Sequence, residues 1–275
     1  MKLSEFKESL TERLTLLKAG IVFTAQRELA YAGNNWASVL STTFFTFSVL
    51  IFIKVIYSNV HTIAGYSYNE MLVYFFIYQL TYYGNYIVTV RNLTDLIPDV
   101  NKGNLDMVLI KPVPSLFYLM SRSISIVSII TDAIPPTLAI MFSINWNAIE
   151  FSFSGIIIGF IVWIFGLIAL NAFQILAALP VFWFGESQNI LDLASNIAAG
   201  AGTMIPREGY PPTLRVLLGT IIPAIIAGGF TTSILLNKVN PFLLLAWAGA
   251  VAIISMFVKN IAWNYALRHY SSASS

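Results

Sequence analysis

Long apolar stretches alternate along this chain with short polar segments. Six stretches are predicted to be membrane-spanning helices, and they cover residues 36–57, 71–90, 116–142, 153–184, 190–205 and 241–263. About 20 predominantly apolar residues in helical form are enough to cross the hydrocarbon core of a bilayer. The pattern therefore predicts an all-α integral membrane protein with six transmembrane helices.

The chain begins with a segment of a different kind. Between residues 3 and 18, apolar residues recur at helical spacing and charged residues occupy the other face. Such a pattern is typical of an amphipathic helix that lies in the membrane interface. Residues 19–31 are apolar with a polar interruption at 26–28, which predicts an elbow that enters the interface.

Breakers and small residues mark particular spans. Pro135 and Pro136 lie inside the third predicted span and should kink it, because proline removes a backbone donor. Gly155 and Gly159 in the fourth span have a spacing that permits close approach of another helix. Residues 216–236, interrupted by proline and glycine, fit either a straight seventh span or a re-entrant hairpin, and we predict the hairpin.

Composition supports the same class of protein. Of 275 residues, 57% are hydrophobic and only 10% are charged, which leaves too little polar surface to coat a soluble globule. The net charge of +2 gives no indication of a nucleic-acid partner. Most lysines and arginines fall in segments that six spans place in the cytoplasm together with both termini, and few fall outside.

Enzyme chemistry finds little support in the residues. The chain has no cysteine, and His61 and His269 are predicted to lie on opposite sides of the membrane. We therefore expect no metal site and no catalytic cluster. The chain also lacks a Gly-Lys dipeptide, so it cannot form a phosphate-binding loop of the P-loop type. We expect no cofactor in this chain.

Asp132 is the acidic residue that most requires an explanation. It lies inside the third span, where an uncompensated charge costs on the order of 3 kcal/mol by insertion scales. A role in a transport pathway and a structural role at the proline kink remain equally open. For Asp192, near the start of the fifth span, the structural role is favoured because a helix N-terminus stabilises a carboxylate.

Other polar and aromatic residues of the spans form a candidate translocation pathway for an amphiphilic cargo. With Asp132, this set consists of Gln79, Tyr83, Asn171, Gln174, Ser195 and Asn196. For any single one of them, an interhelical hydrogen bond worth about 1 kcal/mol is the simpler explanation. The aromatic density of the second span likewise indicates either packing or a wall for substrate.

A compact polar turn at residues 101–112 interrupts the apolar helices. Gly103 can end a helix in the left-handed conformation, Asp106 and Lys111 stay hydrated, and Pro112 opens the next span. We expect this turn to be a connector that receives force from a soluble partner.

Three short motifs give the chain a family resemblance. They are G-N-L-D-M-V-L-I-K-P at 103–112, Y-P-P-T-L-R at 210–215 and A-L-R-H-Y-S-S-A at 266–273. In their order and placement the chain resembles the permease subunits of type-2 ATP-binding-cassette (ABC) transporters, within their six-span bacterial branch. The resemblance implies one membrane domain over 1–275, made of an elbow segment (1–35), a membrane domain (36–265) and a cytoplasmic tail (266–275).

The resemblance also implies a function and partners. The chain is expected to be an exporter permease in a bacterial plasma membrane, moving a lipid-like, peptide or drug-like substrate. A separate ATPase subunit is expected to hold ATP and magnesium, a second permease, either a copy of this chain or a homologue, to complete the pathway, and lipids to surround it. The implied coupling residues are Asp99, Lys102, Gly103, Asn104, Leu105, Asp106, Lys111 and Pro112. The implied gate hairpin contains Tyr210, Pro211, Pro212 and Pro223. The alternative is an ion- or proton-coupled carrier that uses Asp132.

Overall fold

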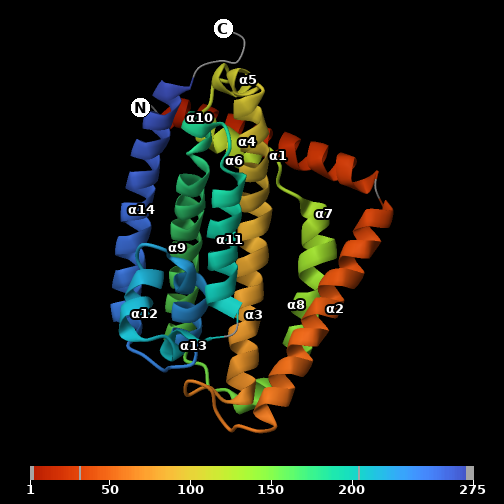
Figure 1. Ribbon diagram of the computed structural model, residues 1–275, viewed down its shortest axis with the longest axis vertical. Helices are drawn as coiled ribbons and strands as arrows, with labels where there is room; N and C mark the ends of the chain where they lie inside the picture. Colours follow the sequence, from red (N-terminus) through yellow and green to blue (C-terminus); the bar gives the residue numbers. More distant parts are fainter. Residues whose placement is uncertain (1–2, 31, 204, 271–275) are drawn as a thin grey trace.

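The computed structural model describes residues 3–30, 32–203 and 205–270, and these residues are almost entirely helical, without a β-strand among them. The helices form an elongated bundle (Figure 1). One end carries α1 and α5 and is called the α5 end. The opposite end carries α12 and α13 and is called the hairpin end. The prediction of an all-α architecture is confirmed.

The first helix is longer than the sequence pattern predicted. α1 runs without a break from Leu3 to Leu29, so the predicted separate elbow at 19–31 is wrong in its boundary. It crosses the α5 end of the bundle (Figure 1). Gly20 lets it approach the next layer closely, because a Cβ there would lie 2.8 Å from the backbone oxygen of Ser121.

The second predicted span is also longer than expected. α3 (Tyr68–Asn85) continues through a π-helical segment, η1 (Tyr86–Val90), into α4 (Arg91–Asn101) as one uninterrupted helix. The extension past 90 forms because α4 is amphipathic and buries its apolar face. The helix therefore reaches from the hairpin end to the α5 end (Figure 1).

The third predicted span is divided. α6 (Ser115–Ser121) ends before residues 122–125, and the chain restarts as α7 (Ile126–Ser128), π-helical η2 (Ile129–Ala133) and α8 (Ile134–Ser143). The single span predicted at 116–142 is therefore wrong. The prolines of α8 have no N–H to donate to carbonyls of the preceding turn, and η2 immediately precedes them.

The remaining helices complete the bundle. α2 covers Ala32–Tyr57, α9 covers Phe153–Ala178 and is followed by α10 (Val181–Phe184), α11 covers Gln188–Thr203, and α14 covers Pro241–His269. Short 3₁₀ turns, η3 (Trp146–Ala148) and η4 (Arg207–Gly209), lie in the loops. Among the described residues, four helices are long and apolar enough to cross a membrane: 33–57, 126–143, 153–184 and 241–269. The predicted spans in α3 and α11 do not meet this measure; α11 has only 16 residues, and polar residues interrupt α3.

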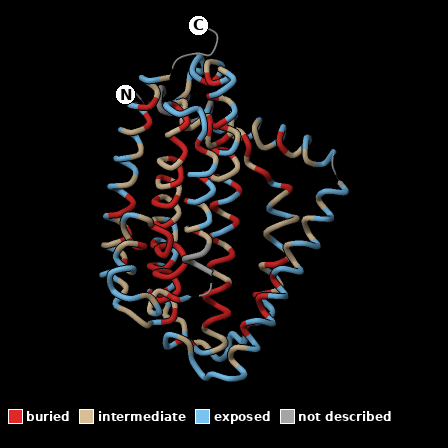
Figure 2. The backbone as a smooth tube through the Cα atoms, viewed as in Figure 1, coloured by how far each residue is buried: buried red, intermediate tan, exposed pale blue. Residues whose placement is uncertain are grey.

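Buried and exposed residues are distributed as expected for a protein surrounded by lipid. α9 lies inside the bundle between α14, α11, α3 and α13, and its inner face is buried (Figure 2). Large apolar side chains point outward instead, with Phe44 76% and Phe257 67% exposed. Soluble proteins rarely expose such continuous apolar surface. The outward face of the bundle is therefore suited to lipid, in agreement with an integral membrane protein.

Residues 212–235 form a hairpin and not a straight span. α12 (Pro212–Leu218) is followed by a bend that contains Pro223, and the chain returns through π-helical η5 (Ile226–Phe230) and α13 (Thr231–Leu235). The segment before α12, which contains Glu208, and the segment after α13, which contains Lys238, are called the two shoulders of the hairpin. Both contact the same loop at the hairpin end: Glu208 accepts a hydrogen bond from Tyr66, and Lys238 donates one to the oxygen of Gly65. The segment therefore enters and leaves at one end of the bundle.

The hairpin packs against small residues of α9. A Cβ at Gly166 would lie 2.4 Å from the backbone nitrogen of Ala227, which only glycine permits. Gly159 and Gly155 also face α13, and the hydroxyl of Thr231 donates a 3.4 Å hydrogen bond to the oxygen of Gly159. The close approach predicted from the glycine spacing is confirmed, with the hairpin as the neighbour.

Candidate functional site

A hollow of about 680 Å³ lies between α2, α3 and η2. Four of the predicted pathway residues line it: Gln79, Tyr83, Asp132 and Asn196. They come from α3, η2 and α11, which are distant in sequence. The fold thus brings together side chains that the sequence grouped only by their polarity.

A second hollow of about 240 Å³ adjoins the first on the other side of α3. Gln174 and Ser195 line it, and the Gln174 amide lies 3.4 Å from the Ser195 hydroxyl. Tyr78, Tyr82 and Tyr86 line both hollows. We call the two hollows together the α3 groove. Its polar residues come from α2, α3, η2, α9 and α11.

Three tyrosines form a ladder along the groove. Tyr78 stacks on Tyr82 with 6.2 Å between ring centroids, and Tyr82 stacks on Tyr86 at the same distance with planes 12° apart. Residues four apart on a helix lie on one face, which explains the ladder. Tyr82 and Tyr86 are each 40% exposed, so their rings are available to a bound molecule.

Asp132 lies in η2 on the opposite wall of the larger hollow. Its carboxylate accepts a 2.8 Å hydrogen bond from the hydroxyl of Thr131, and the rings of Tyr82 and Tyr83 line the same hollow. Tyr86 begins η1 and Gly228 of η5 lines the smaller hollow, so three π-helical segments border the groove. Such segments often occur at functional sites, because they redirect side chains out of the regular helical ladder.

Asn171 does not line the groove. Its amide nitrogen donates a 2.9 Å hydrogen bond to the hydroxyl of Thr89 and ties α9 to η1. For this residue, the interhelical explanation accounts for the polar side chain.

The polar turn after α4 lies at the tip of the α5 end (Figure 1). Gly103 has φ = 74°, the left-handed conformation expected of it. The turn leads into α5 (Leu105–Leu109), whose faces differ. Met107 is 67% and Ile110 is 75% exposed, so an apolar pair faces outward at the tip.

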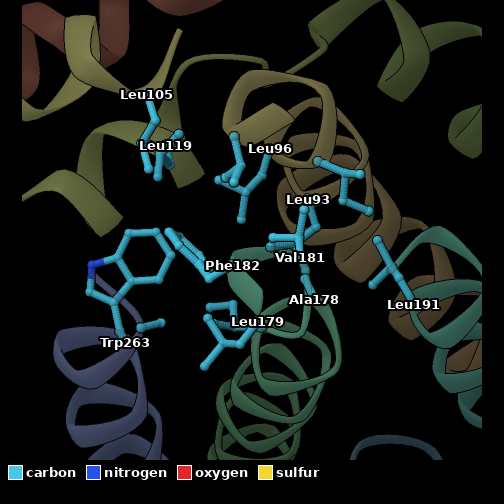
Figure 3. Packing of buried hydrophobic residues seen from close by; sticks show 14 of the residues in the cluster. Leu93, Leu96, Leu105, Leu119, Ala178, Leu179, Val181, Phe182, Leu191 and Trp263 are labelled. Carbon is cyan, nitrogen blue, oxygen red and sulfur yellow. The ribbon is translucent and has the colours of Figure 1, made fainter. Parts of the chain in front are cut away.

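Leu105 faces the interior instead. It is fully buried, lies beside Leu119 and belongs to the cluster that contains Leu96, Phe182 and Trp263 (Figure 3). Leu105 therefore fixes α5 to the bundle and cannot contact a partner directly. The exposed members of the predicted coupling set are Lys102, Asn104, Lys111 and Pro112.

Two acidic residues of the predicted coupling set have partners within the chain. Asp99 pairs with Arg122, and Asn104 lies 3.5 Å from the same carboxylate group. Asp106 lies beside Tyr270; burial, and then this nearby carboxylate, raise the pKa of the Tyr270 hydroxyl. Both contacts hold the tip in a defined position against α6 and the end of α14.

The hairpin is fixed by a buried hydrogen-bond network. Glu208 accepts 2.8 Å hydrogen bonds from the hydroxyls of Tyr66 and Ser233, and its carboxylate lies 3.1 Å from the guanidinium of Arg207. Burial raises the pKa of Tyr66 far above its ordinary value, and the charge of Glu208 adds to this effect. Tyr66 therefore remains a hydrogen-bond donor at physiological pH.

A second contact fixes the other shoulder of the hairpin. The ammonium of Lys238 lies 2.7 Å from Glu70 and 4.6 Å from the ring centroid of Tyr66. Burial tends to raise the pKa of Glu70, but hydrogen bonds from Lys238 and the Ser67 amide lower it overall. Both shoulders thus converge on Tyr66.

The four predicted gate residues occupy distinct places. Tyr210 accepts a 3.0 Å hydrogen bond from Arg215 through its backbone oxygen, Pro211 and Pro212 begin α12, and Pro223 lies in the bend. Sequence reasoning missed Tyr66, Glu208 and Ser233. The adjacent charges at 207–208, in an otherwise apolar region, were the available signal.

Residues 43–274 match the family described as "ABC-2 family transporter protein". The chain belongs to the ABC-2 transporter family. No curated protein and no solved structure matched the chain. The family is the membrane component of ABC transporters, so the chain is an integral membrane permease subunit, and an ATPase partner is implied. Family membership favours the permease over the ion-coupled carrier.

Proposed function

We propose that this permease exports a lipid-like, peptide or drug-like substrate through the α3 groove, driven by a separate ATPase. One observation carries the proposal: a single helix, Tyr68–Asn101, joins the exposed tip to the tyrosine ladder and to the hairpin end. Movement of the tip is therefore transmitted to the groove without an intervening hinge loop.

The exposed side chains of the tip suit a protein partner. Met107 and Ile110 face outward on a structure fixed from inside by Leu105, and Lys102 and Lys111 flank them. An apolar centre with a charged rim is the usual composition of an interface. The ATPase subunit contacts this surface, and it alone holds ATP and magnesium.

The proposal also includes an orientation in the membrane and a second permease subunit. The α5 end and both termini face the cytoplasm of a bacterial cell, and the hairpin end faces outward. A second permease copy, identical or homologous, closes the pathway on the side of α2. ATP-driven movement of the tips then alternates access to the groove, with the hairpin as the outer gate.

Copurification with the ATPase tests the docking surface. Met107→Ser combined with Ile110→Ser should reduce ATPase recovery from the membrane, while thermal stability stays unchanged because both side chains are exposed. Val60→Ser is the matched control, since Val60 is an exposed apolar residue in the loop at the hairpin end. Unchanged ATPase recovery and transport-linked hydrolysis in the double variant contradict docking at α5.

Proteoliposomes with ATP and the proton gradient varied separately distinguish permease from carrier. For the complex, transport should require ATP, and Asp132→Asn should alter the rate but keep the nucleotide dependence. Transport that ignores ATP and follows the gradient would overturn the proposal.

A further inference from the structure

The α3 groove has a single sign of charge. Among the described side chains that line its two hollows, Asp132 is the charged one. The basic residues nearby, Arg27 and Arg91, line an adjoining hollow nearer α1, which Asp132 also lines, and there Arg91 pairs with Glu28. The carboxylate therefore faces the groove without a basic side chain among its lining.

We propose that the α3 groove is a binding site for an amphipathic cation, a molecule with an apolar body and a protonated or quaternary nitrogen. This inference rests on the proposed function, because it specifies the substrate class of the same groove. Asp132 is the counter-ion, and the tyrosine ladder contacts the apolar and cationic parts.

The ladder is suited to a cation by its electrostatics. The face of an aromatic ring is the negative end of its quadrupole, and it attracts a cation within about 6 Å of the centroid. Tyr82 and Tyr86 are each 40% exposed and stand in the hollow that contains Asp132. The tyrosine faces on one wall of the hollow and the Asp132 carboxylate on the other thus both favour a positive charge.

Two buried amide oxygens give an independent indication. Asn85 and Gln174 line the smaller hollow, and their buried oxygens, Asn85 Oδ1 and Gln174 Oε1, have no hydrogen-bond partner among the described residues. Gln174 is fully buried, and Asn85 is 9% exposed. Buried acceptors are costly when unpaired, so a protonated amine can satisfy them with its N–H groups, whereas a quaternary nitrogen leaves them unpaired. An anionic ligand is repelled by the Asp132 carboxylate.

The apolar area of the groove completes the match. Tyr78 contributes ring surface shared by both hollows, and Phe45 and Leu170 extend it on either side. A cation without an apolar body leaves this surface wet, whereas an amphipathic one covers it.

Equilibrium dialysis with tetraphenylphosphonium tests the inference. The full chain, with any subunits that copurify, is kept in uncharged dodecyl maltoside micelles, and empty micelles serve as the blank. The cation should bind above the blank, and tetraphenylborate, an anion of nearly the same shape, should not. Asp132→Asn should weaken binding at least about tenfold, as expected for the loss of a partly buried counter-ion.

Matched variants separate charge from folding. Asp132→Glu should retain binding, and Asp192→Asn should leave it unchanged, because Asp192 lies outside the groove and accepts its hydrogen bond from Gln188. Tyr82→Phe should bind as the parent does, whereas Tyr82→Leu should weaken binding several-fold. Equal binding of cation and anion, no binding above the blank, or unchanged binding in Asp132→Asn overturns the inference.

A lipid headgroup and a soluble amphiphile share this chemistry. Phosphatidylcholine added to the micelles should compete with the probe if the natural cation is a lipid headgroup. It should not compete if the cation is soluble. The binding test uses no nucleotide, so failure to bind the cation would not contradict copurification with the ATPase. Loss of ATPase copurification would likewise not contradict binding of the cation.

Discussion

The hydroxyl of Tyr66 donates a 2.8 Å hydrogen bond to the carboxylate of Glu208, across 142 positions of sequence. This bond joins the loop before α3 to the shoulder of the hairpin. Tyr66 is fully buried, and its hydroxyl also lies 3.2 Å from that of Ser233. Tyr66 therefore helps to hold the hairpin to the start of the long α3 helix, together with the Lys238–Glu70 contact at the other shoulder.

Tyr66→Phe should destabilise the protein by about 1.5–3 kcal/mol, the usual worth of a hydrogen bond to a charged group. Denaturant unfolding of the detergent-solubilised protein measures this. Tyr68→Phe is the matched control, because the Tyr68 ring packs on Tyr57 and the substitution keeps that contact. Equal stability of Tyr66→Phe and the parent would show that the network does not hold the hairpin.

Acidification should weaken the other shoulder. The pKa of Glu70 is lowered in the folded state, so this group contributes stability above its ordinary pKa of 4.5, and the contribution is lost as the pH falls through the lowered value. Glu70→Gln should therefore be less stable than the parent at pH 7, and the difference should close below pH about 4. Melting temperatures measured from pH 7 to pH 3 test the sign, and a constant difference would contradict it.

Gly166→Ala should impair folding. The new methyl group would lie 2.4 Å from the backbone nitrogen of Ala227, and neither backbone can yield without separating α9 from the hairpin. Gly84→Ala in α3 is the control, because a Cβ there meets nothing within 4 Å. We expect a lower melting temperature and a lower yield of monodisperse protein for Gly166→Ala alone. Similar behaviour of the two variants would argue against the close packing.

Cysteine labelling tests the orientation in a chain that has no cysteine of its own. Single cysteines at Asn104 and Arg268 should react with impermeant thiol reagents only from the cytoplasmic side. One at Thr213, an exposed position of α12, should react only from outside. Ser274, in the predicted cytoplasmic tail, lies outside the described residues, so Arg268 is the C-terminal position tested. Labelling of Arg268→Cys from outside would favour a seventh span.

Local patterns were sufficient for much of the fold. Apolar length predicted α2, α9 and α14, and the breakers at 223 and 228–229 predicted the hairpin. The end of α3 was misjudged because α4 is amphipathic and continues the helix outside the apolar run. The break after α6 was missed although the local pattern signals it, because Ser121, Arg122, Ser123 and Ser125 make this stretch polar.

The candidate site was harder to predict, because pairing across the fold decides it. Periodicity placed Asp132 and Gln79 in spans, but only the folded chain brings them to one hollow. Leu105 and Met107 look equally apolar in the sequence, and only the packing of α5 separates a buried anchor from an exposed contact. The charges at 207–208 mark Glu208, but nothing local in the sequence links it to Tyr66, which lies 142 positions away.

The fit of Gly166 against Ala227 makes α9 and the hairpin one packed body, whereas α2 packs chiefly on α8 and η2 as a second. The α3 groove lies along the seam between these bodies. A change in their relative tilt would alter the width of the seam. The free energy needed to open or close the route would then include the cost of the contacts that cross the seam, among them the hydrophobic cluster that joins α2 and α8 to α3 and Leu236 at the hairpin end.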